Sequence, residues 1–186
     1  MTGDSQSGFL VIGVGNSDRG DDGIGPAVIS RLRGRLPAGV LAIECRGDLL
    51  GLIDEWKGLA GIVVIDAMAP RGRGGRIERL DLVGEPVAAE FAPSSTHAFG
   101  LAETIEIARS LNQLPRHLIA HLVEGERFGI GAPLSPAVAA VVDTVADRVL
   151  AELSRLAHLV RAELCENAQS RLRGLSEYVC PHVSRP

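Results

Sequence analysis

The hydrophobic residues of this chain fall into short continuous runs, separated by segments in which apolar positions recur at helical spacing. Residues 9–14 and 61–65 are typical of strands buried on both faces of a parallel sheet, and residues 40–44 predict a further strand between them. Helical spacing over residues 23–36, with Pro26 tolerated in the first turn, predicts a helix after the first run. A second helix is predicted over residues 48–56. Strand, helix, strand, helix, strand predicts a doubly wound α/β layer.

The second half of the chain continues this pattern. A glycine- and arginine-rich loop over 71–75 leads into an alternating segment, 76–82, that predicts an edge strand. Residues 83–95 read as irregular, residues 97–111 as a helix capped by Ser95 or Thr96, and residues 117–123 as a further strand. Ser135 and Pro136 form a strong helix start after the loop 125–134. One inward stripe is expected on that last helix: Val138, Val141, Val142, Val145, Val149 and Leu153.

Together these elements predict a three-layer α/β/α fold with a doubly wound, mostly parallel twisted sheet of about five strands. The length of 186 residues, 46% of them hydrophobic, suits one core better than two. We therefore expect a single domain over residues 1–156. Beyond Leu156 the apolar pattern degrades into a charged segment, and residues 157–186 are interpreted as a C-terminal tail.

Charge and targeting signals narrow the classes of partner. The formal net charge of -4 offers no basic field for phosphate backbones, so neither nucleic acid nor an anionic membrane is an expected partner. The polar N-terminus lacks a basic segment, and the apolar run 9–14 is too short for a signal or membrane span, which favours a cytoplasmic location. The three cysteines form no CxxC pair, so no disulfide framework or zinc knuckle is indicated.

The glycine-rich turn over residues 13–25 is the most informative stretch. A nucleotide-binding loop would need a third glycine where Asp18 stands, and Asp18, Asp21 and Asp22 would repel a pyrophosphate. Acidic residues at a helix N-terminus instead favour the helix dipole or a bound cation. Asp21 and Asp22 could also simply cap the helix.

Three residues converge on one edge of the predicted sheet. Asp66 ends the third buried run, which brings it to the same carboxyl edge as Asp22, and His97 follows a long crossing loop that could reach this edge. Two carboxylates and one imidazole would form a cation site with open coordination positions, and this ligand set does not choose among zinc, nickel, iron and manganese. Taken singly, Asp66 could instead anchor a turn and His97 could cap its own helix.

Other chemistries are less well supported. The chain contains neither a Gly-x-Ser-x-Gly elbow nor a His-Glu-x-x-His motif. Cys45 near the predicted edge is interpreted as a small apolar residue rather than as a nucleophile. His117 and His121 are assigned to packing, and Glu124 could either border the site or lie in a solvated loop, as could Glu126.

Several motifs, in order, resemble the hydrogenase maturation endopeptidase family. They are Gly15-Asn-Ser-Asp-Arg-Gly-Asp-Asp-Gly-Ile-Gly-Pro26, then Val-Ile-Asp-Ala67, then Thr96-His-Ala-Phe-Gly-Leu101, with Val123-Glu-Gly and Leu134-Ser-Pro136 later. The likeness extends from about residue 9 to residue 153. One departure is Glu44-Cys-Arg-Gly-Asp48, where family members often have Gly-Gly-Thr or Gly-Gly-Ser, and it concerns local substrate contacts.

The resemblance implies a specific activity. It implies an endopeptidase, aspartyl-type or metal-dependent, that removes the C-terminal extension of a nickel-containing hydrogenase large-subunit precursor after nickel insertion. Asp22, Asp66 and His97 would bind the metal, with Asp22 and Asp66 as the catalytic candidates. The nickel would be carried by the substrate, and no nucleotide or organic cofactor is implied. An alternative function is a non-catalytic, metal-sensing chaperone of the immature subunit, which would leave the precursor's mass unchanged.

Overall fold

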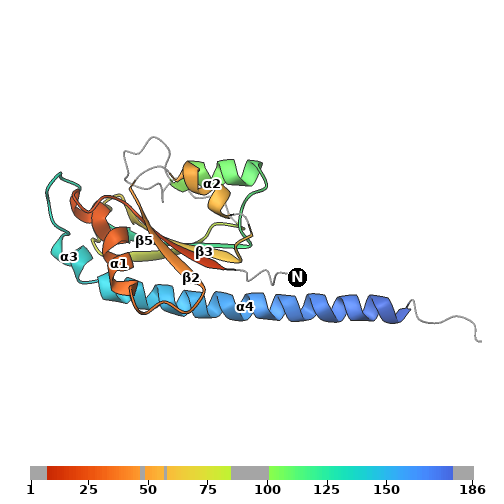
Figure 1. The fold of residues 1–186 in the computed structure, drawn as a ribbon. Coiled ribbons are helices and arrows are strands. Elements are labelled where there is room, and N and C mark those ends of the chain that lie inside the picture. Colours follow the sequence, from red (N-terminus) through yellow and green to blue (C-terminus); the bar gives the residue numbers. More distant parts are fainter. Residues whose placement is uncertain (1–7, 47–48, 57, 85–100, 178–186) are drawn as a thin grey trace, which may run out of the picture. The chain divides into compact units, whose positions relative to one another are not determined.

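A computed structural model describes residues 8–46, 49–56, 58–84 and 101–177, with side chains as far as residue 167 (Figure 1). Its centre is a five-stranded sheet in the order β2-β1-β3-β5-β4. The strands are β1 Phe9–Val14, β2 Val40–Cys45, β3 Gly61–Met68, β4 Ile77–Asp81 and β5 His117–Glu124. Among the strands of the described residues, β4 alone runs antiparallel to its neighbour, β5, so the predicted α/β class and mostly parallel sheet are confirmed.

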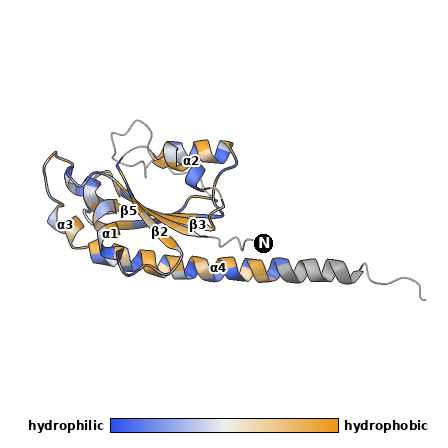
Figure 2. Cartoon of the chain, in the orientation of Figure 1, coloured by the Kyte–Doolittle hydropathy of each residue, from blue (hydrophilic) through white to orange (hydrophobic). Residues whose placement is uncertain are grey.

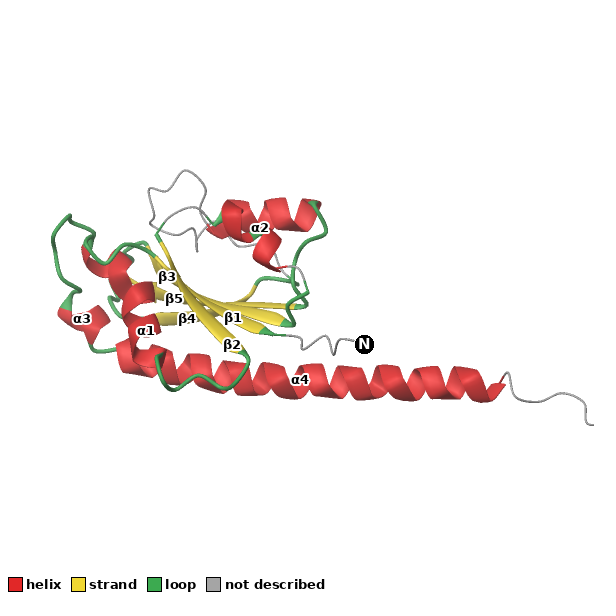
Figure 3. Ribbon diagram, in the orientation of Figure 1, coloured by secondary structure: helices red, strands yellow, loops and turns green. Residues whose placement is uncertain are grey.

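Helices cover both faces of the sheet (Figure 3). The helices are α1 Ile24–Leu32, α2 Leu101–Ser110, α3 Pro136–Ala139 and α4 Val142–Glu177. Short 3-10 helices are η1 Gly20–Gly23, η2 Leu50–Leu52 and η3 Asp54–Trp56. One core lies on the α2 side of the sheet, where Trp56, Leu101 and Ile105 pack on alternate residues of the central strands. Helix α1 packs against β1, β2 and β3, and the stripe from Val138 to Leu153 is largely buried.

The strands follow directly from the apolar runs. All eight residues of β3 are buried, because this central strand is covered on both faces. Figure 2 shows the sheet as mainly hydrophobic, whereas hydrophilic and hydrophobic residues alternate around the helices. The strand that was predicted to end at Asp66 continues to Met68, so Asp66 lies within β3 rather than after it.

The helices depart from the sequence prediction at three places. Residues 49–56 form η2 and η3 instead of one α-helix, with i to i+3 hydrogen bonds such as Ile53 N to Leu50 O. The apolar residues of this segment do have helical spacing. However, Gly51 is a poor helix former, and the segment is too short to compensate for it. Helix α1 ends at Leu32 rather than near residue 36, and Gly34 follows with a positive φ of 76° that a continuing helix would not allow.

The helix predicted from Ser135 is divided in two. Ser135 caps α3 as expected, since its hydroxyl accepts the N–H of Val138 at 3.4 Å and Pro136 occupies the first turn. The N–H of Val141 then bonds the carbonyl of Val138, which overwinds the chain into an i to i+3 turn before α4 begins at Val142. A continuous helix was therefore the wrong prediction.

The C-terminal segment, interpreted from the sequence as a tail of uncertain structure, is helical as far as Glu177. Helix α4 continues to Glu177, and residues Ser154–Pro186 form a compact unit separate from Met1–Leu153. The predicted boundary at residue 156 stays a prediction. No helix among the described residues is long and apolar enough to cross a lipid bilayer.

Candidate active site

The carboxyl ends of β1, β3 and β5 lie at one edge of the sheet because these three strands are parallel. Each strand leads into a loop there: the turn before α1, the arginine-rich loop after β3, and the long loop after β5. This is the edge at which doubly wound folds place their sites.

The turn after β1 holds Asp22 in place. Gly15 has a φ of 121°, and a Cβ atom there would overlap the carbonyl oxygen of Asp22, so this close crossing of the turn requires glycine. The Oδ2 atom of Asp22 accepts the backbone N–H of Asn16 at 2.9 Å, and the N–H of Gly15 bonds the carbonyl of Cys45 at 2.9 Å. Asp22 is almost fully buried, with 4% of its surface exposed. Its carboxylate is therefore fixed at the end of β1.

Asp66 lies deeper, in β3. It shares its face of the strand with Ile62, Val64 and Met68, which belong to the core on the α2 side. Its Oδ1 atom accepts the N–H of Ala67 at 2.7 Å, whereas Oδ2 has no hydrogen-bond partner among the described residues. An unpaired, buried carboxylate oxygen is costly, and it indicates a ligand site when it faces other polar groups.

The electrostatics of Asp66 show that the two acids act on one another. Burial raises the pKa of Asp66 to about 7, the N–H of Ala67 acts in the opposite direction, and the negative charge of Asp22 raises that pKa further. The structure thus brings Asp22 and Asp66 to the same edge of the sheet. Two neighbouring carboxylates in a buried place favour a bound cation or a shared proton.

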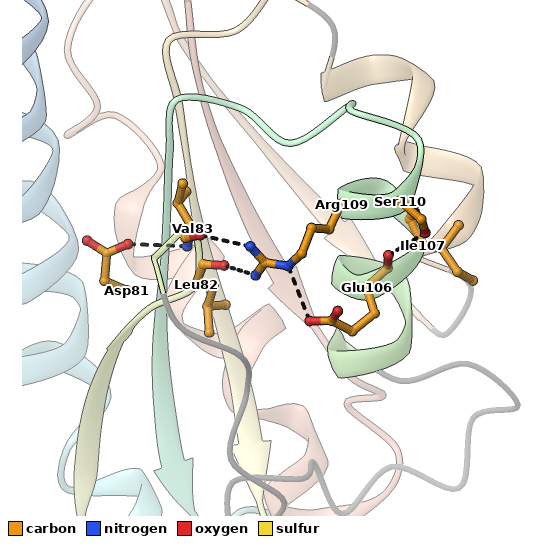
Figure 4. A network of polar contacts seen from close by, with 7 residues as sticks. All are labelled: Asp81, Leu82, Val83, Glu106, Ile107, Arg109 and Ser110. Carbon is orange, nitrogen blue, oxygen red and sulfur yellow. Dashed lines mark hydrogen bonds and ion pairs between the residues drawn. The ribbon is translucent and has the colours of Figure 1, made fainter.

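The third predicted ligand, His97, lies outside the described residues, and His, Cys, Asp and Glu side chains form no metal-binding group of three within the described part. The helix that follows it, α2, is anchored to the end of β4 (Figure 4). Arg109 donates to the carbonyl oxygens of Val83 and Leu82, each at 2.9 Å, and approaches Glu106 at 3.4 Å. These bonds fix α2 over the face of the sheet that carries Asp66.

Asp21 has a role that the sequence did not reveal. It is fully buried, and its Oδ2 atom accepts the N–H groups of Glu126 at 2.7 Å and Arg127 at 2.9 Å, while Oδ1 accepts that of Ser135 at 2.6 Å. Burial alone would raise the pKa of Asp21, but these backbone hydrogen bonds together hold that pKa below its ordinary value. Asp21 therefore ties the loop after β5 to the turn that carries Asp22. Only the fold could show this, because the partners are more than 100 residues away.

Residues 46–152 match the family model described as hydrogenase maturation protease, which is more than half of the chain. The chain belongs to this family. The matched range includes Asp66 and His97, while Asp22 precedes it. No curated protein sequence matches the chain significantly.

Solved structures of several such proteases share the fold. The hydrogenase maturating endopeptidase HybD from E. coli has a TM-score of 0.67 at 23% identity, covering 80% of this chain and 93% of its own. The maturation protease HycI from Thermococcus kodakarensis has a TM-score of 0.61 at 20% identity, with the same coverage. The hydrogenase 2 maturation peptidase from a Thaumarchaeota archaeon has a TM-score of 0.58 at 28% identity, covering 78% of this chain and 97% of its own.

Glu124 organises a second loop of this maturation protease. It is fully buried, and Oε1 accepts the N–H groups of Arg71 at 2.6 Å and Arg73 at 2.7 Å, while Oε2 accepts the Nε–H of Arg76 at 3.1 Å. Burial opposes ionisation, but these donors hold the pKa of Glu124 below its ordinary value. A solvated loop was the wrong interpretation for Glu124, because its carboxylate is buried. Glu124 lies at the carboxyl end of β5, so its interpretation as a border of the site stays a prediction. Glu126 is exposed.

His121 belongs to the opposite face of the sheet. It alternates with Leu118, Ala120 and Leu122, which lie in the core on the α2 side, and it is 98% buried with neither ring nitrogen hydrogen-bonded among the described residues. Burial lowers the pKa of His121 to about 4; Glu152 acts to raise it and the nearby arginines to lower it. His121 is a packed core residue, as the sequence suggested, and it lies on the face of the sheet opposite to the one that carries Asp66.

Proposed function

We propose that this maturation protease removes the C-terminal extension of a nickel-containing hydrogenase large-subunit precursor after nickel has been inserted. Asp22, Asp66 and His97 contact the nickel that the substrate carries, and the protease has no resident metal. The observation that supports this best is the Oδ2 atom of Asp66, which is buried, has no partner among the described residues, and lies close enough to Asp22 for that charge to raise its pKa.

The available side chains fit a substrate-borne cation. A divalent cation would offset the repulsion between the two carboxylates and give the Oδ2 atom of Asp66 the partner that it lacks. Carboxylate and imidazole ligands suit nickel among other transition metals. Three ligands from the protease leave coordination positions open for ligands that belong to the precursor. A protease that senses an already inserted metal requires such open positions.

The peptide hydrolysis assigned to this site consumes one water. The water oxygen adds to the scissile carbonyl carbon, the bond from that carbon to nitrogen breaks, and the proton is transferred to the leaving amine. Asp22 and Asp66 are the candidates for orienting this water and moving its proton. The substrate's nickel would polarise the carbonyl or position the scissile peptide next to these carboxylates.

The decisive experiment mixes the purified protease with nickel-loaded precursor and follows the precursor's mass. We expect a shorter large subunit and a released C-terminal peptide, and no change with nickel-free precursor. Asp22→Asn, Asp66→Asn and His97→Ala should each abolish processing. Asp18→Asn is the matched control, because the exposed Asp18 contributes its backbone N–H and carbonyl, and not its carboxylate, to the hydrogen bonds among the described residues.

The outcomes separate the possible errors. Unchanged precursor mass with wild-type protease, together with tight nickel-dependent binding, would favour the non-catalytic chaperone. Equal processing of nickel-loaded and nickel-free precursor would remove nickel sensing from the proposal. Normal processing by the Asp66 and His97 variants would show that the site has been assigned wrongly.

A further inference from the structure

The loop after β5 exposes an uncharged, largely apolar segment beside the acidic edge. Residues 128–134 read Phe-Gly-Ile-Gly-Ala-Pro-Leu. Ile130 is 89% exposed, the highest value among the large hydrophobic side chains of the described residues. Pro133 is also exposed, and Phe128 and Leu134 are only partly buried.

Single exposed apolar residues are common on protein surfaces and need no explanation. Ile130 differs from such residues because the loop that carries it is anchored at both ends. The carboxylate of Asp21 accepts N–H groups from Glu126 and Arg127 at the start of the loop and from Ser135 at its end. The two stems are therefore held at fixed positions.

The tip of the loop is anchored as well. The N–H of Gly131 bonds the carbonyl of Asp18 at 2.7 Å, and the N–H of Gly20 bonds the carbonyl of Ala132 at 2.9 Å. Gly20 has a φ of 60°, and a Cβ atom there would overlap the carbonyl oxygen of Arg127. Ile130 is thus held outward by backbone hydrogen bonds on both sides of it. A loop whose backbone is held in this way loses little backbone conformational freedom on binding, which favours affinity.

The partner of this loop follows from where the loop is fixed. Its hydrogen bonds go to residues 18–21, the turn that continues directly into Asp22. Figure 1 shows the segment between β5 and α3 beside the turn that precedes α1. A protein whose nickel contacts Asp22 would therefore meet this loop with the surface that surrounds its nickel. The absence of charge from residues 128–134 selects an apolar contact surface.

We propose that residues 128–134 are a docking element for the hydrogenase precursor, with Ile130 inserted into an apolar pocket close to the precursor's nickel. This inference rests on the proposed function, because the precursor is the partner that it names. It assigns recognition of the substrate to a contact outside the acidic site. Docking through Ile130 contributes to substrate binding and leaves the chemical step unchanged.

The test compares Ile130→Asp and Ile130→Leu with wild-type protease, using nickel-loaded precursor. Burial of one large aliphatic side chain corresponds to roughly a tenfold or greater effect on affinity. We therefore expect Ile130→Asp to raise KM and the Kd for the precursor by about tenfold or more, with kcat at saturation unchanged. Ile130→Leu should keep most of the affinity.

Leu111→Asp is the matched control. Leu111 is 57% exposed and follows α2 on the way to the start of β5, at the opposite edge of the sheet, so its substitution should leave both KM and Kd unaltered. A urea titration of each variant checks folding, which the outward position of Ile130 should preserve.

The two proposals fail in different ways. If wild-type protease processes the precursor and Ile130→Asp has the KM and Kd of the wild type, the docking inference is overturned and the proposed function stands. A fall in kcat without a rise in KM would overturn it too. If wild-type protease binds the precursor without processing it, the proposed function fails, and a weaker Kd for Ile130→Asp would still support docking. Absence of any binding by wild-type protease would overturn both.

Discussion

The carboxylate of Asp21 accepts the backbone N–H of Ser135 at 2.6 Å, although 114 residues separate them in the sequence. The same carboxylate accepts two further N–H groups from Glu126 and Arg127. One buried side chain therefore closes the loop after β5 onto the turn that positions Asp22. Asp21 therefore fixes the position of this loop at the carboxyl edge of the sheet.

Replacement of Asp21 should destabilise the protein strongly. Asp21→Ala would leave three backbone N–H groups without their acceptor, and each such group costs about 1 to 3 kcal/mol when it stays buried. Because only the hydrogen bond to Ser135 is buried, whereas those to Glu126 and Arg127 are partly exposed, we expect a loss of about 2 to 3 kcal/mol in the free energy of unfolding, measured by urea denaturation. Asp18→Ala, in the same turn but exposed, should lose far less. Equal stabilities for the two variants would contradict the role given to Asp21.

The same interactions predict a dependence of stability on pH. Because the folded-state pKa of Asp21 lies below its ordinary value, its contribution is fully present above the unfolded-state pKa and is lost as the pH falls through the folded-state pKa. Asp21→Asn should therefore be compared with the wild type from neutral pH to about pH 3, a range that spans the ordinary pKa of aspartate. The stability difference between them should shrink as the pH falls, and a constant difference would contradict this account.

Substitution of Asp66 is expected to raise the stability of the protein and to abolish its activity. Its carboxylate is buried beside Asp22 with Oδ2 unpaired among the described residues. Asp66→Asn keeps an acceptor for the N–H of Ala67 and removes the buried charge, so stability at pH 8 should rise, on the order of 2 kcal/mol. Processing of the precursor should be lost. Thermal unfolding and precursor mass would be measured on the same sample, and a variant both less stable and fully active would refute this prediction.

The burial of His121, on the other face of the sheet, predicts a second dependence of stability on pH. Its folded-state pKa of about 4 is below the ordinary value of 6.5, because burial disfavours the charged ring, with Glu152 opposing this shift and Arg79 and Arg148 supporting it. The unfolded chain therefore binds the extra proton, and stability is present above pH 6.5 and is lost as the pH falls toward 4. The loss over this range is about 3 kcal/mol.

His121→Leu tests this assignment. The variant should lose less stability than the wild type between pH 6.5 and pH 4, because it has no ring to protonate. Urea denaturation at half-unit pH intervals measures the difference. Arg79 and Glu152, which form a two-bond ion pair at 2.8 and 3.0 Å, stay in place as an internal reference. Parallel pH profiles for the two proteins would show that another group titrates.

Arg109 should matter for the position of α2. Arg109→Leu would leave the carbonyl oxygens of Leu82 and Val83 without their donor, which we expect to destabilise the protein by about 1 to 3 kcal/mol. Glu106→Gln, which alters only the longer contact at 3.4 Å, is the control and should cost under about 1 kcal/mol. Thermal unfolding of both variants gives the comparison. An equal effect of the two substitutions would show that the backbone contacts of Arg109 are not the important ones.

Most departures from the sequence prediction concern helices, and those over residues 49–56 and at Val141 have local causes. Leu49, Ile53 and Trp56 have helical spacing and are buried, yet Gly51 and the short length of the segment give 3-10 turns. The stripe from Val138 to Leu153 is real, but the i to i+3 bond at Val141 divides the helix that carries it. Apolar spacing indicates which side faces the core, and it does not determine where backbone hydrogen bonding changes.

The sequence by itself determined the strands of the sheet and the edge at which Asp22 and Asp66 meet, because short apolar runs form buried parallel strands whose carboxyl ends coincide. The sequence could not show which of its acidic side chains have their carboxylate oxygens hydrogen-bonded and which do not. Asp21 and Glu124 are fully engaged by backbone N–H groups, whereas Asp66 keeps one buried oxygen unpaired among the described residues. Only the tertiary structure decided this, since the donors that satisfy a carboxylate come from loops more than 50 or 100 residues away in the chain.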